Sequence, residues 1–465
     1  MKSKILFGDI AKFSNGKTSP ERDDNAKYNV FGSNGIIGKS NLTNTEDEIV
    51  IIGRVGSYCG SVYFSKHKCW VTDNAIKCEA KKDNVPSFIY YQALKLNLNN
   101  FRVGSGQPLL NQGILNSLEI NYFDPHTQKK IAHILSTLDD KIELNRKMNQ
   151  TLEEMAQALF KSWFVDFDPV HVKMGCANDE ELEVASRELG ISKELLELFP
   201  SEFEESELGM IPEGWEWKKF GDILIPKKGK NITKDTVTDG SVPVVAGGLT
   251  PAYYHSEYNA KAPVITVSAS GANAGYVNLY TQNIWASDCS YINEGMTKFV
   301  YSMYLFLKEN QKEITRMQQG AAQPHVYPKD LMRLVIANPN TNLWSYLEGL
   351  IEPMFKQIGN NEKEIQTLQK TRDTLLPKLL SGELDVSELE MEVAPIVDNE
   401  TKSIFDIYKD KFGESFDIFG MYWNDIEKQV ALVLQCIEEN KIIWDVLSKE
   451  ELETIEEVKK GNVVF

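Results

Sequence analysis

The sequence predicts an α+β protein with two similar mixed α/β target-recognition domains, separated by two long antiparallel helices that form a coiled-coil spacer. Three observations carry this prediction: an internal repeat, short glycine-punctuated strand segments in each copy, and a long apolar heptad stripe after each copy. Two equal copies joined through paired helices also predict a pseudo-two-fold molecule. An extra helical C-terminal tail is expected after the second stripe.

The repeat consists of matched segments about 215 residues apart in the chain of 465 residues. One inserted residue before the last matched pair moves the offset from 215 to 216. The matched pairs are FGDI at 7–10 and 220–223, IVIIGRVGSYCGSVYF at 49–64 with VITVSASGANAGYVNL at 264–279, and GSGQP at 104–108 with GAAQP at 320–324. A tandem duplication of a unit of roughly 165 residues, an ordinary single-domain length, explains these matches.

Each copy begins with a mixed lobe, which we place at residues 1–125 and 215–338. The β-rich segments lie between Gly, Asn and Ser residues, and each lobe then has one segment with helical spacing. The clearest segments are the strands IVIIG (49–53) and APVITVSAS (262–270) and the helices SFIYYQALKLNL (87–98) and KFVYSMYLFLKEN (298–310). Both lobes are therefore predicted to mix strands and helices.

A long helix is expected after each lobe, over 126–165 and 339–382, because apolar residues recur at heptad steps. The first stripe is Ile131, Leu135, Leu138, Ile142, Leu152, Ala156, Leu159 and Trp163. The second is Leu347, Ile351, Met354, Ile358, Ile365, Leu368, Leu375 and Leu379. Each stripe needs an apolar partner, and the other stripe is the natural one. Pro377 is expected to kink or stop the second helix.

Asn145 and Asn361 occupy equivalent positions in the two stripes. A polar residue in a coiled-coil seam fixes register at some cost in stability. The alternative is that both side chains face solvent at the edge of the seam.

The remaining segments are an acidic connector at 166–214 and an acidic extension at 383–465. The extension contains FGMYWNDIEKQVALVLQCIEEN (419–440), which is amphipathic and predicted to be helical. It either packs on the spacer or a partner, or is a solvated appendage.

The net charge of −17 is distributed unevenly, and the distribution bears on a nucleic-acid partner. The two lobes carry +3 each, whereas the connector carries −11 and the extension −13. The local field matters more for DNA contact than the total charge. The repeated lobes therefore remain compatible with DNA, although a charge of +3 by itself predicts nothing.

Several classes of function lack their residue patterns. The six Cys residues form no CxxC pair, and the six His residues are scattered, so no zinc site or disulfide framework is indicated. GSNGIIGKS (32–40) fails the spacing of a phosphate-binding loop, and no GxGxxG, HExxH or GxSxG occurs. No apolar run or signal sequence is found, so we expect a cytoplasmic protein with no membrane contact and no catalytic activity by itself.

Three stretches together resemble the specificity (S) subunits of type I restriction-modification systems, the HsdS family. QKKIAHILSTLDDKIELNRKMNQTLEEMAQALFKSWFVDFDPV (128–170) resembles the central conserved region of that family. IPEGWEWKKFGDI (211–223) resembles the start of the second target-recognition domain, and LQKTRDTLLPKLLSGELDV (368–386) resembles the distal conserved region. The resemblance covers roughly residues 5–386.

The resemblance implies a DNA specificity subunit that binds a bipartite site in double-stranded DNA. It also implies docking of two methyltransferase (M) subunits, with restriction (R) subunits joining the complex. No cofactor is expected in this subunit, whereas S-adenosylmethionine, ATP and Mg are expected on the partner subunits. The rival interpretation is a coiled-coil scaffold that binds two copies of a protein partner and never touches DNA.

The candidate DNA contacts surround the repeated GxxQP segment. Its Gly permits close backbone approach and its Gln offers both a donor and an acceptor, although a purely structural turn is an equal alternative. The shared Gln107 and Gln323 are expected to position the loop or touch the DNA backbone. The residues that differ between the copies are the better candidates for reading bases: Arg102, Ser105, Arg316, Gln318 and His325. Arg54, Ser57, Lys230 and Asn273 complete the predicted set.

The candidate partner contacts lie at the helix ends and comprise Leu159, Trp163, Phe164, Leu375 and Leu379. For Trp163 and Phe164 there are two alternatives. They either seat a methyltransferase subunit or bury into the junction with 166–214.

Overall fold

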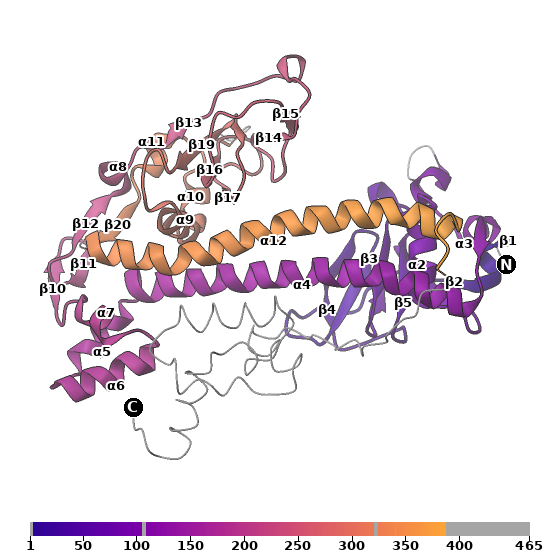
Figure 1. Cartoon of the computed structure of the whole chain (residues 1–465), viewed down its shortest axis with the longest axis horizontal. Coiled ribbons are helices and arrows are strands. Elements are labelled where there is room, and N and C mark those ends of the chain that lie inside the picture. Colours follow the sequence, from indigo (N-terminus) through magenta and orange to yellow (C-terminus); the bar gives the residue numbers. More distant parts are fainter. Residues whose placement is uncertain (1–2, 105–107, 320–323, 340, 387–465) are drawn as a thin grey trace. The chain divides into compact units, whose positions relative to one another are not determined.

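The computed structural model describes residues 3–104, 108–319, 324–339 and 341–386 (Figure 1). The predicted helical extension at 387–465 lies outside these described residues. The chain divides into two compact units. Unit 1 contains the residues up to Asn145 together with those from Lys363 onward, and unit 2 contains Arg146–Glu362. Each unit therefore holds one lobe and one half of each long helix.

Unit 1 contains a four-stranded sheet, a three-stranded sheet and a two-stranded sheet. The strand orders are β2-β8-β5-β6, β4-β3-β7 and β1-β9, and every pairing is antiparallel except β3 with β7. The elements are β1 Ser3–Leu6, α1 Phe7–Ile10, β2 Ala11–Asn15, β3 Tyr28–Gly32, β4 Gly35–Ser40, β5 Ile49–Gly53, η1 Gly56–Tyr58, β6 Val62–Ser65, β7 Trp70–Val71, β8 Ala75–Ala80, α2 Pro86–Lys95, η2 Leu98–Phe101, α3 Gln112–Ser117 and β9 Glu119–Tyr122.

Unit 2 repeats this topology with different side chains, which confirms the predicted duplication. Its strand orders are β13-β19-β16-β17, β15-β14-β18 and β12-β20, and the only parallel pairing among them is β14 with β18. The elements are β12 Glu216–Lys219, α8 Phe220–Ile223, β13 Lys227–Lys228, η3 Lys234–Thr236, β14 Val242–Val245, β15 Tyr253–His255, β16 Val264–Ser268, β17 Val277–Tyr280, β18 Trp285–Ala286, β19 Cys289–Asn293, α9 Val300–Glu309, α10 Gln311–Arg316, α11 Pro328–Leu331 and β20 Val335–Asn338.

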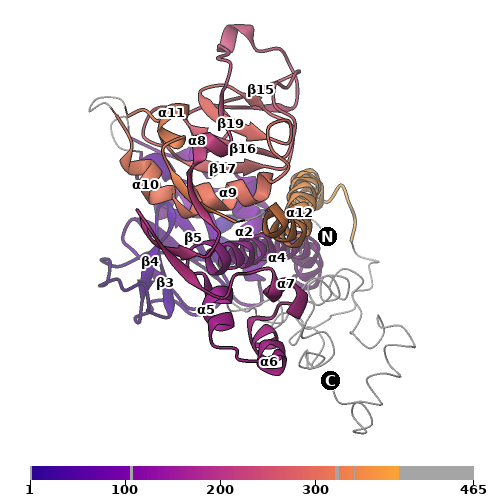
Figure 2. The same cartoon turned by 90° about the vertical axis from the view of Figure 1, so that its left-hand side faces the viewer.

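The central strands β5 and β16 are buried along their whole length. Their sequences, IVIIG and VITVS, are continuous β-branched or apolar runs, as expected for strands covered on both faces. In unit 2, α9 packs against β16 and β17, and its Tyr301 stacks on Phe355 of α12 with ring centroids 4.9 Å apart. Figure 2 shows α9 between this sheet and α12. The lobe helix therefore joins the sheet to the long helices.

The two long helices are α4 (Pro125–Phe164) and α12 (Thr341–Ser381). In unit 1, Asp139 forms a 2.7 Å ion pair with Arg372, and Asn145 Nδ2 donates to Glu364 at 2.7 Å. In unit 2, Asn361 Nδ2 donates to Asn149 at 2.7 Å, and the rings of Phe164 and Trp344 stack with centroids 4.5 Å apart. Within each unit the residue numbers rise on α4 as they fall on α12, so the predicted antiparallel pairing is confirmed.

Asn145 and Asn361 are 1% and 3% exposed. Both side chains donate across the helix pair, so the alternative that they face solvent is wrong. Asn145 Oδ1 has no hydrogen-bond partner among the described residues, which makes this polar contact costly as well as specific.

The expected stop at Pro377 is wrong, because α12 continues to Ser381. Leu379 and Leu380 are 2% and 0% exposed and belong to the main core of unit 1, together with Phe7, Phe88 and Ile131. Burial of these leucines holds the last turn in place despite the backbone hydrogen bond that proline cannot donate.

The connector after α4 has its own elements: α5 Asp168–Met174, α6 Asp179–Leu189, α7 Lys193–Glu197, β10 Phe203–Ser206 and β11 Gly209–Pro212. Aromatic contacts fasten it to the end of α4. Trp163 meets Phe199 edge-on at 5.4 Å, and Phe164 lies 5.7 Å from Trp215. The connector is therefore an ordered part of unit 2.

Candidate nucleic-acid interface

Four segments of unit 1 meet beyond the ends of its strands, and we call them loop cluster 1: residues 33–34, 54–58, 73–74 and 102–110. Arg54 N–H donates to the carbonyl of Asn74 at 2.9 Å, and Leu110 N–H donates to the carbonyl of Arg54 at 2.9 Å. Gly56 N–H donates to the carbonyl of Pro108 at 3.1 Å, while the Ser33 hydroxyl donates to Asn74 at 2.5 Å. Backbone hydrogen bonds thus hold loops from four places in the chain together.

The loop that contains GSGQP is closed at its base. Val103 and Leu109 exchange two backbone hydrogen bonds of 2.8 Å, and Gly104 has a φ of 96°, a left-handed value that favours glycine. Ser105 and Gln107 lie outside the described residues. The structure therefore fixes the two ends of this loop.

The predicted DNA contacts of unit 1 that are described all belong to loop cluster 1. Arg54 is half-buried, and its Nη1 donates to the carbonyl of Asp73 at 3.2 Å, so this guanidinium braces a neighbouring turn. Ser57 is exposed. Arg102 is exposed and makes no hydrogen bond or ion pair within the described residues, so its guanidinium has all five donors available.

Loop cluster 2 is the counterpart in unit 2: residues 247–249, 269–273, 287–288 and 318–326. Ala269 N–H donates to the carbonyl of Asp288 at 3.1 Å, and Val326 N–H donates to the carbonyl of Ala269 at 3.0 Å. Gln319 and His325 exchange two backbone hydrogen bonds of 2.9 Å. This cluster is therefore built from the same kinds of contact as loop cluster 1.

The correspondence extends to individual atoms. Gly271 N–H donates to the carbonyl of Pro324 at 3.1 Å, the same atoms and distance as Gly56 with Pro108. The Gln319–His325 pair stands 216 residues after the Val103–Leu109 pair. The GxxQP echo thus marks one conserved loop base in both units, and the repeated Pro carbonyl is a hydrogen-bond acceptor in that base.

The predicted contacts of unit 2 divide into free and engaged side chains. Arg316 is exposed and makes no hydrogen bond or ion pair within the described residues. Gln318 Nε2 donates to the carbonyl of Ala274 at 2.8 Å, and Asn273 Nδ2 donates to that of Gly247 at 3.5 Å, so both amides brace the cluster. Gln323 lies outside the described residues.

His325 and Lys230 are both placed beside aromatic rings. His325 stacks on Tyr327 with ring centroids 5.7 Å apart. Lys230 Nζ lies 5.8 Å from the ring of Trp285, whose Nε1 donates to the carbonyl of Lys230 at 2.8 Å. Lys230 therefore stands next to the 287–288 turn, away from the GxxQP loop.

Sequence reasoning missed several exposed residues of the two clusters. Tyr58 is 50% exposed in loop cluster 1, where Asn34 and Asn74 are also exposed, and Leu249 is 55% exposed in loop cluster 2. Tyr58 follows the predicted Ser57 directly and could have been included with it. Asn34, Asn74 and Leu249 come from turns whose place beside GxxQP only the tertiary structure shows.

The predicted partner contacts are mostly internal. Trp163, Phe164 and Leu379 are 2%, 4% and 2% exposed, whereas Leu159 and Leu375 are half-buried. Trp163 and Phe164 occupy the junction with the connector, which matches the second of their two alternatives.

Neither a metal centre nor a membrane segment is found in the described part of the chain. No group of three or more His, Cys, Asp or Glu side chains there could hold a metal ion. Within the same residues, no helix has the length and apolar character that crossing a membrane requires.

Comparison with known proteins identifies relatives of the whole arrangement. A family model described as the type I restriction modification DNA specificity domain matches residues 4–154 and 212–365. The type I restriction enzyme MjaIX specificity subunit of Methanocaldococcus jannaschii is 31% identical over 338 residues, which cover 66% of this chain and 71% of that protein. The HindI specificity subunit of Haemophilus influenzae is 28% identical over 327 residues, which cover 58% and 70%.

A solved structure supports the fold. The S subunit of a type I restriction-modification system from M. genitalium superimposes with a TM-score of 0.53 at 17% identity, covering 82% of this chain and 96% of that chain. The two matches to the family model fall on the two copies of the repeat. This chain therefore belongs to the family of type I restriction-modification DNA specificity subunits.

Proposed function

We propose that this chain is the DNA specificity subunit of a type I restriction-modification complex and that each loop cluster reads one half of a bipartite DNA target. The observation that carries the proposal is the pair of matching loop bases with different side chains on them. A shared backbone scaffold suits two equivalent DNA duplex segments, and different side chains suit different base sequences.

Three equivalent positions illustrate the difference. Arg54, Tyr58 and Arg102 of loop cluster 1 correspond to Ala269, Asn273 and Gln318 of loop cluster 2. Arginine pairs bidentately with guanine in the major groove, whereas alanine offers only apolar contact and Gln318 is engaged with Ala274. We therefore assign base reading to Arg102 in the first half-site and to Arg316 and His325 in the second.

The remaining predicted contacts keep supporting roles in this proposal. Arg54, Gln318 and Asn273 position the loops, and Ser57 and Lys230 contact the DNA backbone. Ser105, Gln107 and Gln323 are proposed at the loop tips, which lie outside the described residues. Phosphate contacts fix the register of the protein on DNA, and base contacts then provide the specificity.

The chemistry is proposed to reside on partner subunits. Two methyltransferase subunits dock on the long helices, where the half-buried Leu159 and Leu375 remain accessible and Trp163, Phe164 and Leu379 support them from inside. S-adenosylmethionine, ATP and Mg belong to the methyltransferase and restriction subunits. The complex acts on double-stranded DNA in the cytoplasm.

The alternative of a scaffold that never touches DNA is not favoured. It gives no reason for two loop clusters that share a backbone and differ in exposed side chains. Membership of the DNA specificity family also speaks against it.

The test is selection of DNA sites from a random bipartite library by the chain assembled with its methyltransferase subunits. We expect two defined half-sites at a fixed spacing, with affinity that falls steeply as the salt concentration rises. Selection of no consensus, or salt-independent binding, would reject the proposal.

A further inference from the structure

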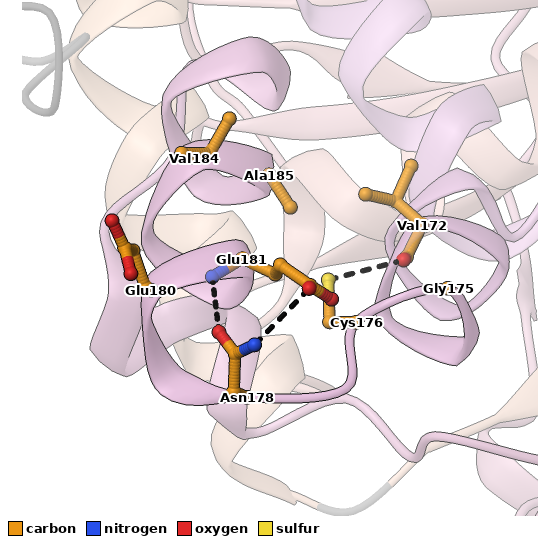
Figure 3. Close-up of a pocket in the computed structure, with 8 residues that line it drawn as sticks. All are labelled: Val172, Gly175, Cys176, Asn178, Glu180, Glu181, Val184 and Ala185. Atoms are coloured by element: carbon orange, nitrogen blue, oxygen red, sulfur yellow. Dashed lines mark hydrogen bonds between the residues drawn. The ribbon is translucent and has the colours of Figure 1, made fainter.

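A shallow groove lies between α5 and α6 in the connector (Figure 3), with a volume of about 580 Å³. One wall is formed by Val172, Gly175 and Cys176, and the other by Asn178, Glu180, Glu181, Val184 and Ala185. Figure 3 shows Val172 and Ala185 pointing toward one another across the groove. None of these residues belongs to either loop cluster.

The groove has an apolar part that solvent reaches. Val184 is 50% exposed, and Met174, which precedes Gly175, is 52% exposed. Covering such a side chain completely contributes about 1.5–3 kcal/mol. An apolar side chain of a partner would therefore gain from seating here.

The rim of the groove is acidic, and cations of the connector do not neutralise it. The connector, residues 166–214, has fourteen acidic and three basic side chains. All three basic side chains have partners elsewhere: Lys173 donates to the carbonyls of Glu197 and Phe199, Arg187 pairs with Glu183, and Lys193 pairs with Asp179. Glu180 makes no hydrogen bond or ion pair within the described residues.

The acidic wall is rigid before any partner binds. Asn178 Oδ1 accepts from Glu181 N–H at 2.9 Å, and the Glu181 carboxylate accepts from Ala177 N–H at 2.7 Å. This reciprocal capping fixes the first turn of α6. Beneath it, Phe167 meets Trp215 edge-on at 5.7 Å. A preorganised surface loses little entropy when it binds.

We propose that this groove docks a basic amphipathic helix of a protein partner. An apolar residue of that helix seats among Val172, Cys176 and Val184, and a lysine or arginine pairs with Glu180. DNA is excluded as the occupant by its charge, and so is the acidic segment 383–465 of this chain, which carries −13. The inference rests on the proposed function for the partner's identity, which we take to be a methyltransferase subunit.

Cys176 provides a direct readout of the groove. It is half-buried, whereas Cys59, Cys69, Cys78 and Cys289 are buried, so it is the most accessible thiol among the described residues. We would measure the rate of N-ethylmaleimide alkylation at Cys176 by peptide mass spectrometry. The rate would be compared for the chain alone, with target DNA, and with the methyltransferase subunits.

We expect alkylation to slow at least about tenfold once the methyltransferase subunits exceed about ten times their dissociation constant. DNA alone should leave the rate unchanged. Glu180→Lys should weaken assembly about threefold to tenfold, and Val184→Asp should weaken it too and restore alkylation. Glu207→Lys is the matched control, because it makes the same charge change at an exposed connector position outside the groove.

The outcomes separate the docking site from the proposed function. An unchanged alkylation rate in a complex that still selects its DNA target overturns the docking site and leaves the proposed function standing. Protection that depends only on the concentration of this chain, or equal loss with Glu207→Lys, also overturns it. If no complex with methyltransferase subunits forms, the docking site and the proposed subunit partnership fall together.

Discussion

Tyr304 on α9 donates its phenol hydrogen to Glu153 Oε1 on α4 at 2.5 Å. The tyrosine is 3% exposed, so this bond is made away from solvent. Unit 1 contains the same chemistry, because Tyr91 on α2 donates to Asp139 on α4 at 2.6 Å. In both units a buried tyrosine of the lobe helix is tied to a carboxylate of α4, which orients the lobe on its long helix.

Replacing Tyr304 by Phe should lower the free energy of unfolding by about 1.5–3 kcal/mol, because it removes a buried hydrogen bond to a charged group. Denaturant unfolding followed by hydrogen exchange of unit 2 peptides would measure the loss. Tyr301→Phe is the matched control, since the Tyr301 hydroxyl makes no hydrogen bond within the described residues. Equal losses for the two variants would argue against a specific Tyr304–Glu153 bond.

Glu348 of α12 caps the N-terminus of α9 and makes unit 2 sensitive to pH. Its carboxylate accepts from Tyr301 N–H and Ser302 N–H at 2.9 Å each and from the Ser302 hydroxyl at 2.5 Å. Burial raises the pKa of Glu348, and the hydrogen bonds from Ser302 and Tyr301 oppose this shift. Glu362 follows the same direction, because burial raises its pKa and the hydrogen bond from Thr281 opposes the shift.

A raised pKa in the folded state means that folding favours the protonated carboxyl. The stability it contributes is fully present below the unfolded pKa and is lost as pH rises through the folded pKa. The wild-type chain should therefore lose stability relative to Glu348→Gln as pH rises from about 4 toward neutrality. Denaturant curves at a series of pH values would measure this, and parallel pH profiles for the two proteins would contradict it.

Arg102→Ala should relax the sequence preference at the first half-site only, because Arg102 is an unpaired, exposed cation of loop cluster 1. Loss of one good bidentate base contact costs about 1–3 kcal/mol of discrimination. Arg316→Ala is the mirror variant and should affect the second half-site only. Site selection from a bipartite library reads both halves at once, and an equal loss at both halves for either variant would refute the two-reader arrangement.

Leu380→Ala should destabilise unit 1, although the residue lies near the end of the described chain. Leu380 is 0% exposed in the core that also holds Phe7 and Phe88, and such truncations cost about 2–5 kcal/mol. Hydrogen exchange should quicken in β5 and β8 and stay unchanged in β16 and β19. Leu384→Ala, at a position 39% exposed, should change stability by less than about 0.5 kcal/mol. Faster exchange in unit 2 would contradict the assignment of Leu380 to unit 1.

The sequence by itself determined the duplication, the strand and helix types, and the pairing of the long helices. These features are written in local periodicity: a run such as IVIIG has to be covered on both faces, and a heptad stripe has to find another stripe. Family membership also followed from contiguous stretches of sequence. Each of these signals lies within one segment or in the match between two segments.

Only the tertiary structure decided which side chains are free to act. Trp163 and Phe164 resemble a partner surface in sequence, but the connector covers them. Arg54 and Gln318 resemble base readers, but carbonyls 19 and 44 residues away along the chain engage their side chains. The physical reason is that exposure and hydrogen bonding depend on neighbours brought from distant parts of the chain, and local periodicity does not encode those neighbours.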